Sequence, residues 1–161
     1  TAIKASLTGH LVLSTLHTNS APSAITRLVD MGVERYQIAA TLRLAMAQRL
    51  VRRLCPHCRK ARKLNESESF ALGRPELAGR TVYEPRGCIY CTGKGYIGRL
   101  GIYEMLPVDE EVSTMIAKGA EEGELVTYMR KHNINLLLGD AIDKLMAGET
   151  SLKEVLAAAA V

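Results

Sequence analysis

The stretch TGHLVLSTLHTN, residues 8–19, carries the clearest signal for the fold of this chain. Its aliphatic run Leu11–Leu16 predicts a short buried strand, and His17 follows directly, ahead of a helix that begins near Ser20. Ligands of open α/β sheets bind beyond the carboxyl ends of the strands, so His17 occupies a position where a ligand contact is expected. A hydrogen-bonded structural role is the common alternative for a single histidine, and the spacing leaves it open.

A second histidine, His10, stands at the other end of the same run, seven residues before His17. Side chains alternate between the two faces of a strand, so this odd separation puts the two imidazoles on opposite faces of a continuous strand. No third metal-ligating residue lies nearby in the sequence. A metal site at this strand is therefore not expected.

Periodic apolar residues and turn signals predict helices and one further strand along the remaining chain. Gly101–Leu106 alternates as a strand, and Ser151 with Glu154 matches a capping box at the start of the last helix. The helices are expected at about residues 20–31, 34–46, 109–116, 124–131, 137–147 and 152–159. Strand, helix and helix in this order at the amino-terminal end indicate part of an α/β layer.

Four cysteines form two C-x-x-C pairs, CPHC at 55–58 and CIYC at 88–91, separated by 29 residues. Four thiolates satisfy tetrahedral Zn²⁺ at about 2.3 Å, and such a closed shell is structural. The interval exceeds the common ribbon spacing of about 15–20 residues, so a protruding loop is expected. Two disulfides or a redox C-x-x-C are the alternatives, disfavoured by the lack of a secretory leader and by the matched pairs. The sequence predicts structural zinc at Cys55, Cys58, Cys88 and Cys91.

The residues beside the cysteines suggest how the site is supported. Gly93 and Gly95 are expected to turn backbone N–H groups toward the sulfurs. His57 is expected to be an exposed neighbour of the site. Few apolar residues lie between positions 59 and 87, so zinc is expected to supply much of the folding free energy of this module.

Length and composition indicate a folded chain of one or two small domains. Of its 161 residues, 47% are hydrophobic and 24% charged, which is enough to build a core. No apolar run approaches the roughly 20 residues of a membrane span, so we expect no direct membrane insertion. The opening Thr1-Ala2-Ile3-Lys4 reads as a helix already under way, and the chain is therefore expected to be a fragment.

Charge is divided unevenly along the chain. Residues 1–63 carry 11 Lys or Arg against 2 acidic residues, whereas residues 64–161 carry 10 against 15. The basic stretch between Arg49 and Lys63 could meet phosphates or an acidic partner, and a solvated basic face is an equal alternative. Phe70 is the only Phe and Trp is absent, which argues against a base-stacking nucleic-acid binder, so no nucleic-acid partner is expected.

No complete catalytic set stands in the sequence. A phosphate-binding loop requires G-x-x-x-x-G-K-[ST], and the only Gly-Lys pair, Gly93-Lys94, is followed by Gly95. No Ser-His-Asp order and no H-E-x-x-H motif is evident either.

Several motifs in one order resemble the type II secretion and type IV pilus assembly ATPases. The stretch 8–19 resembles the histidine box of that family. The other motifs are SAPSAITRLVDMG at 20–32, AQRLVRRLCPHC at 47–58, CIYCTGKGYIGRLGIYE at 88–104 and GETSLKEV at 148–155. Together they resemble the carboxyl-terminal half of the motor domain.

The resemblance implies an α/β fold, a partial RecA-like ATPase lobe with an inserted four-cysteine zinc module and a C-terminal helical region. The expected segments are 1–54 as core, 55–91 as the zinc-binding module, 92–108 as the return strand and 109–161 as the helical region. The implied function is a fragment of a hexameric ATPase that couples ATP hydrolysis to pilin or pseudopilin assembly and protein secretion. The Walker A and B motifs are expected before Thr1, so the fragment alone is expected to be inactive.

The resemblance also implies roles for individual residues. His17 would lie near the terminal phosphate of ATP with His10 in support, since an imidazole can donate to a phosphate oxygen as charge develops. Arg99 matches an arginine near the base or sugar of the nucleotide, with a surface salt bridge as the alternative.

Cofactors and partners follow from the same resemblance. The cofactors are structural Zn²⁺ and, in the parent enzyme, ATP with Mg²⁺. The partners are identical subunits of a hexamer, an inner-membrane platform protein and a cytoplasmic adaptor. The expected location is the cytoplasm, peripheral to the inner membrane.

A binding module without ATP chemistry is the competing interpretation. The unit Cys88-x-x-Cys91-x-Gly93-x-Gly95 is similar to those of the Hsp40 chaperone cysteine-rich domain, which carries four such units where this chain has one. A zinc-ribbon nucleic-acid binder is a third possibility, and affinity that falls steeply with salt would support it.

Overall fold

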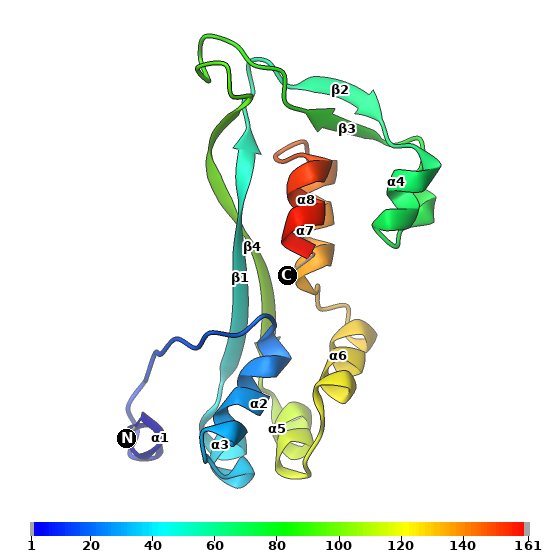
Figure 1. The fold of residues 1–161 in the computed structure, drawn as a ribbon. Helices are drawn as coiled ribbons and strands as arrows, with labels where there is room; N and C mark the ends of the chain where they lie inside the picture. Colours follow the sequence, from blue (N-terminus) through cyan, green and yellow to red (C-terminus); the bar gives the residue numbers. More distant parts are fainter. Residues whose placement is uncertain (1, 160–161) are drawn as a thin grey trace. The chain divides into compact units, whose positions relative to one another are not determined.

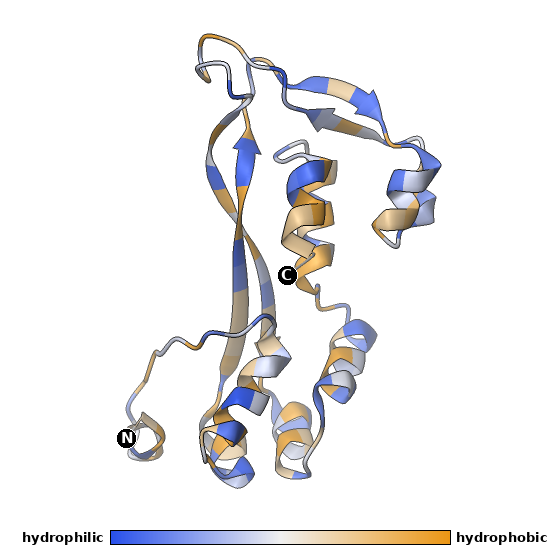
Figure 2. Ribbon diagram, in the orientation of Figure 1, coloured by the Kyte–Doolittle hydropathy of each residue, from blue (hydrophilic) through white to orange (hydrophobic). Residues whose placement is uncertain are grey.

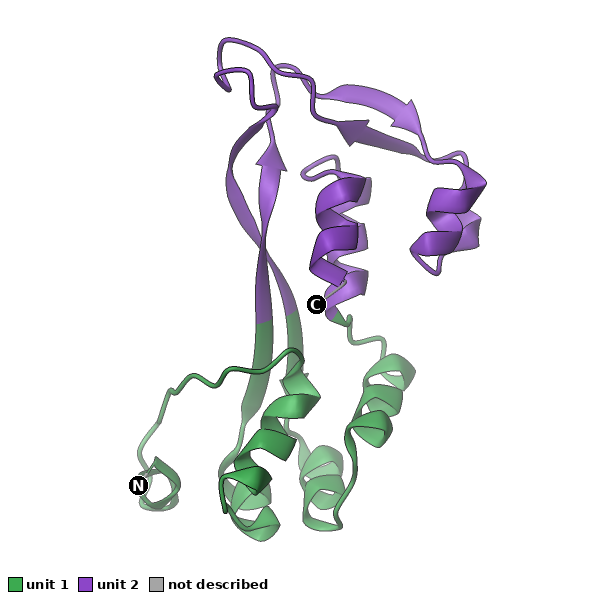
Figure 3. Ribbon diagram, viewed as in Figure 1, with its two compact units in different colours: residues 1–47, 104–136 green, residues 48–103, 137–161 purple. Residues whose placement is uncertain are grey.

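Two long strands, β1 (Leu44–Leu54) and β4 (Tyr96–Pro107), pair with each other and connect the parts of this mixed α/β fold (Figure 1). The computed structural model describes residues 2–159. The chain divides into two compact units, one of residues 1–47 with 104–136 and the other of residues 48–103 with those from 137 onward (Figure 3). The α/β class expected from the sequence is confirmed, and the four-segment division stays a prediction.

Helices make up most of the remaining elements. A second pair of strands, β2 (Lys60–Lys63) and β3 (Thr81–Glu84), is antiparallel, with Lys60 opposite Glu84 and Lys63 opposite Thr81. The helices are α1 (Ala2–Leu7), α2 (Ala21–Asp30), α3 (Arg35–Thr41), α4 (Glu66–Ala71), the 3-10 turn η1 (Pro75–Leu77), α5 (Glu110–Ala117), α6 (Glu122–Lys131), α7 (Leu137–Met146) and α8 (Leu152–Ala159).

In the first unit, helix α2 begins where the sequence predicted. Ser20 is its N-cap, and the Ser20 Oγ accepts from the Ser23 backbone N–H at 3.1 Å. A buried carboxylate, Glu104 of β4, accepts from the Ala21 backbone N–H at 2.7 Å, at the positive end of the helix dipole. Ile25 of α2 then packs in a core that α3, α5 and α6 complete.

The strand predicted at Leu11–Leu16 is wrong in this structure. These residues have no regular structure, and Leu11 and Leu13 are 86% and 88% exposed. A strand needs a neighbour to satisfy its backbone groups, and none of the strands within residues 2–159 pairs with this segment. Local β-propensity alone does not form a strand.

The helix predicted over residues 34–46 is correct only in its first half. Helix α3 ends at Thr41, and Leu42 has an extended backbone with φ −70° and ψ 129°. From Leu44 onward, burial alternates along β1, with Ala45, Ala47 and Val51 inside. This period of two identifies a strand. The spacing of the apolar residues in the sequence alone favours the helical period of 3.6, which is why the predicted helix is too long.

The elements after residue 100 confirm the prediction closely. The strand expected at 101–106 lies within β4, and Asp109 caps α5 by accepting from the Val112 N–H at 2.8 Å. Gly148 ends the α7 region with a φ of +75°. At α8, the Ser151 Oγ accepts from the Glu154 N–H at 3.4 Å, as a capping box requires. The Glu154 carboxylate bonds Arg52 instead of completing the box.

The second unit places the inserted segment against the last two helices. Leu64, Leu72, Leu77 and Val82 are buried and share one core with residues of α7 and α8. Figure 2 shows apolar residues along much of α7 and α8, in contrast to the mainly hydrophilic β2. The inserted segment therefore has more hydrophobic support than its sequence suggested, because its few apolar residues are completed by α7 and α8.

Candidate functional site

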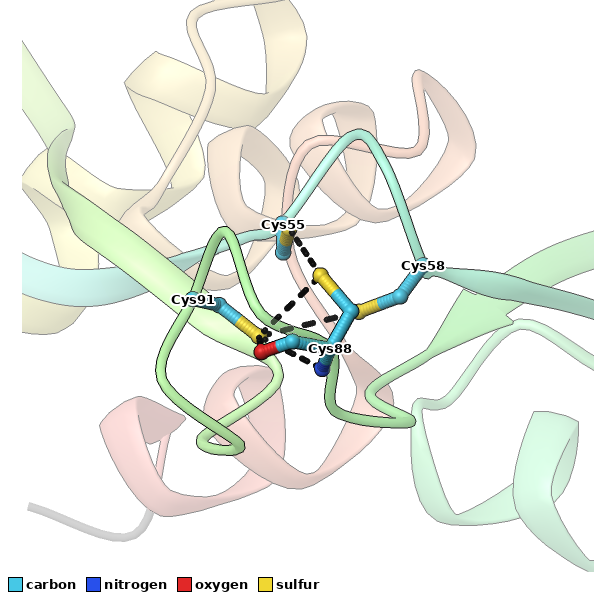
Figure 4. A group of neighbouring side chains, drawn as sticks. All are labelled: Cys55, Cys58, Cys88 and Cys91. Carbon is cyan, nitrogen blue, oxygen red and sulfur yellow. Dashed lines mark hydrogen bonds between the residues drawn. The ribbon is translucent and has the colours of Figure 1, made fainter.

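The four cysteines converge at the end of β1 and in the loop between β3 and β4 (Figure 4). The Sγ atoms of Cys55 and Cys88 are 3.7 Å apart, those of Cys58 and Cys91 3.8 Å, and those of Cys88 and Cys91 3.7 Å. A tetrahedron with metal–sulfur bonds of about 2.3 Å has sulfur–sulfur edges of about 3.8 Å. The four thiols thus fit the shell of a Zn²⁺ ion.

The geometry of the sulfurs disfavours both alternatives for the cysteines, two disulfides and a redox C-x-x-C. All four cysteines are free, with sulfur separations far above the roughly 2.05 Å of a disulfide. All four Sγ atoms lie within 4.8 Å of one another, which a lone redox pair does not require. The geometry therefore favours a metal site that uses every cysteine of the chain.

Backbone N–H groups point at the sulfurs, as thiolate sites need. The N–H groups of Gly87 and Gly95 donate to the sulfurs of Cys58 and Cys91 at 3.3 and 3.1 Å, and the Cys88 N–H donates to Cys91 at 3.2 Å. The expectation holds for Gly95 and is wrong for Gly93, whose N–H bonds the Cys88 carbonyl at 2.8 Å. That bond closes the turn around the second cysteine pair. We call residues 55–58 the first knuckle and residues 88–91 the second knuckle.

Position 95 requires glycine both because of its backbone conformation and because of its close neighbours. Its φ is +81°, and a Cβ there would come within 2.4 Å of the Pro85 Cβ. Its carbonyl also accepts from the Cys55 N–H at 2.9 Å, which joins the two cysteine pairs through the backbone.

The pKa values of two thiols, Cys55 and Cys91, depart from the ordinary value in opposite directions. Burial raises the pKa of Cys55 to about 11. Burial would raise that of Cys91 too, but the N–H groups of Gly95 and Cys88, with the neighbouring thiols, outweigh it and lower the pKa of Cys91 to about 6. The Cys91 thiol is therefore better prepared than that of Cys55 to bind a cation as a thiolate.

A network beside the cysteines ties β1 to the start of α8. Glu154 accepts from the backbone N–H, Nε and Nη2 of Arg52 at 2.6, 3.1 and 3.2 Å. The Arg52 guanidinium lies 4.1 Å from the ring centroid of Tyr96, and the Tyr96 hydroxyl shares a buried 2.8 Å hydrogen bond with Ser151. Sequence reasoning missed this network, although the Ser151 and Glu154 signal pointed to one end of it.

The basic stretch is partly committed to internal contacts. Besides Arg52, Arg59 donates to the Gly148 carbonyl at 2.6 Å and stacks on Tyr83. Arg62 pairs with Glu68 at 2.7 Å and Glu84 at 2.8 Å. Three of the seven cations in this stretch thus stabilise the fold, so the stretch is not one uniform binding face.

His57 lies at the first knuckle, exposed as expected. Its ring stacks on Tyr90 of the second knuckle, with centroids 4.1 Å apart and an interplanar angle of 21°. His57, without Tyr90, also lines a groove of about 480 Å³ together with residues such as Arg53, Pro56 and Ile97.

The other predicted site residues are not members of the cysteine cluster. His10 and His17 are exposed in the first unit, on the irregular segment after α1. The His10 Nδ1 lies 3.2 Å from both the Thr8 Oγ1 and the Ala5 carbonyl, whereas His17 has no hydrogen-bond partner among residues 2–159. Arg99 is exposed on β4 in the second unit.

Comparison with known proteins gives matches to secretion-system and pilus assembly proteins. The family model of the type II/IV secretion system proteins matches residues 1–157. The chain is 46% identical over 155 residues to type II secretion system protein E of Aeromonas hydrophila, covering 96% of this chain and 31% of that protein. It is 42% identical over 156 residues to the type IV pilus assembly ATPase PilB of Myxococcus xanthus, covering 95% of this chain and 28% of that one.

A solved structure, the ATPase DotB of Legionella pneumophila, has a similar fold. The TM-score is 0.60 at 23% identity, and the match covers 98% of this chain and 34% of that one. The chain thus spans about a third of the length of these relatives. Within the described residues no helix is both long and apolar enough to cross a membrane. Since the family model covers nearly its whole length, the chain belongs to the type II/IV secretion system protein family.

Proposed function

We propose that this chain is the zinc-bearing carboxyl-terminal part of an ATPase that drives protein secretion or pilus assembly. The observation that carries the proposal is the match to the secretion family over residues 1–157, together with relatives named as pilus assembly ATPases. The chain spans about a third of these relatives, so ATP hydrolysis with Mg²⁺ is proposed for a longer polypeptide that includes it.

In that polypeptide, residues 1–54 and 92–108 belong to a RecA-like lobe, residues 55–91 form the zinc module and residues 109–161 form a helical region. Six identical subunits couple ATP turnover to pilin or pseudopilin assembly. A platform protein and an adaptor recruit the hexamer to the inner membrane from the cytoplasm. Zinc, when bound by the four thiolates, supplies folding free energy and performs no chemistry on the nucleotide.

His17 is the residue proposed to lie at the terminal phosphate. The structural alternative for His17 loses support, because within the described residues nothing accepts from or donates to its ring, whereas His10 has two nearby oxygens. A histidine exposed in this way is available to donate to a phosphate oxygen as charge develops. His10 is proposed in support, through the segment that it bonds.

Arg99 is proposed to contact the base or sugar. Its alternative was a surface salt bridge, and among residues 2–159 no carboxylate pairs with it, in contrast to Arg52 and Arg62. A planar cation without such a partner can stack on a nucleotide base.

The test is steady-state ATP hydrolysis by the full-length polypeptide. His17→Ala is expected to lower kcat by about 10²-fold or more, as the loss of a donor to transition-state charge does. Arg99→Ala is expected mainly to raise KM, because stacking on the base contributes equally to ground and transition states. His132→Gln is the control, since His132 stacks on Tyr128 and has no proposed nucleotide contact. Equal kcat for the His17 variant and the control would contradict the proposal.

The runner-up function is a zinc-dependent interaction module of chaperone or zinc-ribbon type. The compact four-cysteine centre favours it, and the histidine segment remains unexplained by it. A full-length polypeptide that binds no ATP, but retains stoichiometric zinc, would favour this alternative.

A further inference from the structure

The two cysteine knuckles present an apolar surface that the metal centre does not use. Ile89 and Tyr90, the middle residues of the second knuckle, are 87% and 66% exposed, and Ile97 of β4 is 40% exposed. We call these residues, with Pro56 and His57, the knuckle surface. Pro56, His57 and Ile97 also line the groove of about 480 Å³ described above.

We expect this surface to be well ordered. Four of its five residues lie between the cysteines of a C-x-x-C pair, and the stack of His57 on Tyr90, with ring centroids 4.1 Å apart, joins the two pairs. A surface that is already ordered loses little conformational entropy when a partner binds. Exposed tyrosine and isoleucine side chains on a rigid base are typical of anchors in a protein interface.

The charges around the knuckle surface are positive and unpaired. Arg53 lines the groove, while Arg86 and Lys94 flank the second cysteine pair; within the described residues none of the three forms an ion pair. Glu149 is the one acidic residue of the groove lining. Arg52 and Arg62 pair with carboxylates of the chain. Arg59 also lines the groove, but it donates to the Gly148 carbonyl and stacks on Tyr83. Arg53, Arg86 and Lys94 are therefore the cations best able to attract an anionic partner.

We propose that the knuckle surface binds a short acidic peptide segment that places one apolar side chain in the groove. The partly apolar groove receives the side chain, and Arg53 in its lining pairs with a carboxylate of the peptide. Arg86 and Lys94, close in sequence to the second cysteine pair, attract the remaining acidic residues. A membrane is the less suitable partner, because the groove is a hollow and only two large apolar side chains, Ile89 and Tyr90, protrude strongly.

This inference goes beyond the proposed ATPase role. Within the basic stretch, Arg59 and Arg62 support the fold, so reversing their charges would change stability as well as binding. Arg53 is the cation to reverse, since it lines the groove and has no ion pair within residues 2–159.

The test measures binding of a labelled probe to the zinc-loaded chain by fluorescence anisotropy. The probe is a nine-residue peptide of Glu and Asp with central Leu-Trp, and a Kd of about 10–100 µM is expected for a contact of this size. The double variant Ile89→Ser/Tyr90→Ser and the variant Arg53→Glu are each expected to weaken binding at least about tenfold. Zinc content is measured for every variant, so that a loss of binding is separated from a loss of folding.

Matched controls lie in the same compact unit, away from the groove. Phe70 of α4 is 79% exposed and Arg80 is exposed just before β3, so Phe70→Ser and Arg80→Glu remove one apolar and one basic surface residue. Both are expected to leave the Kd unchanged. Because the assay contains no nucleotide, its outcome is independent of whether the parent hydrolyses ATP.

Several results would overturn the proposal. These are a Kd above about 1 mM, equal weakening by the controls, or unchanged binding when Lys replaces the acidic residues of the probe. Binding to vesicles of anionic lipid that depends on Ile89 while the peptide does not bind would assign the surface to a membrane. Concentration-dependent dimerisation that Ile89→Ser/Tyr90→Ser abolishes would assign it to a second copy of this chain.

Discussion

Replacing Glu154 by Ala should destabilise the second compact unit by about 1.5 kcal/mol. Glu154 accepts three hydrogen bonds from Arg52, and hydrogen bonds to charged groups contribute about 1.5–3 kcal/mol in a protected site. The side chain of Arg52 is 48% exposed and that of Glu154 is 13% exposed, so solvent screening reduces the contribution toward the low end of that range.

The assay is urea unfolding of the zinc-loaded protein, combined with hydrogen exchange of the α8 amides. A loss of 1.5 kcal/mol corresponds to roughly tenfold faster exchange where α8 opens locally. Glu154→Gln keeps one acceptor for the Arg52 N–H and should lose about half as much. High salt should reduce the difference between the wild type and Glu154→Ala, because ions screen the pair.

A second ion pair in the same unit provides the control. Arg74 and Glu76 have side chains that are 45% and 59% exposed, so solvent screens this pair and Glu76→Ala should cost clearly less than Glu154→Ala. If Glu154→Ala costs no more than Glu76→Ala, or if exchange in α8 is unchanged, then the connection from β1 to α8 is not a stabilising one.

Three further outcomes are expected. Cys88→Ser should lose zinc and become protease-sensitive first within residues 55–91; unchanged resistance there would argue against a structural metal. Gly95→Ala, with its Cβ 2.4 Å from Pro85, should destabilise by at least 1 kcal/mol (order of magnitude) more than Gly93→Ala, whose Cβ meets nothing within 4 Å, in the same urea assay. The hydrogen bond to Asp109 raises the pKa of Tyr128 to about 12, so its stabilisation, complete below about pH 10, should disappear between pH 10 and 12. Urea midpoints of Tyr128→Phe should lack this loss, and a parallel decline would contradict it.

The sequence predicted those elements whose signals are local. Caps and stop residues such as Asp109 and Gly148 act on the adjacent turn of backbone, so the helices from α5 to α8 were located closely. The errors at Leu11–Leu16 and in β1 have a different origin. Whether an apolar run becomes a strand depends on a partner strand far away in the sequence, and local periodicity contains no information about that partner.

The same distinction applies to the site. The spacing of the cysteines predicted their convergence, because two C-x-x-C knuckles satisfy the geometry of one metal ion. The bond from Glu154 to Arg52 joins residues 102 positions apart, and no local signal identifies such a pair. The stack of His57 on Tyr90 could have been anticipated, since each ring occupies an inner position of a C-x-x-C pair and convergence of the two pairs on one metal site would bring the rings together.

Hydrogen bonds join the segment that leads into Cys55 to the loop between α7 and α8, so we expect the cysteine cluster and α8 to be coupled. The Leu54 N–H, immediately before Cys55, donates to the Glu149 carbonyl at 2.9 Å, and the Thr150 hydroxyl donates to the Arg52 carbonyl at 2.8 Å. Release of the metal would free Cys55 and weaken these bonds, so α8 should loosen together with the knuckles. Because Glu149 also lines the groove beneath the knuckle surface, a peptide bound there would contact the loop on which the position of α8 depends.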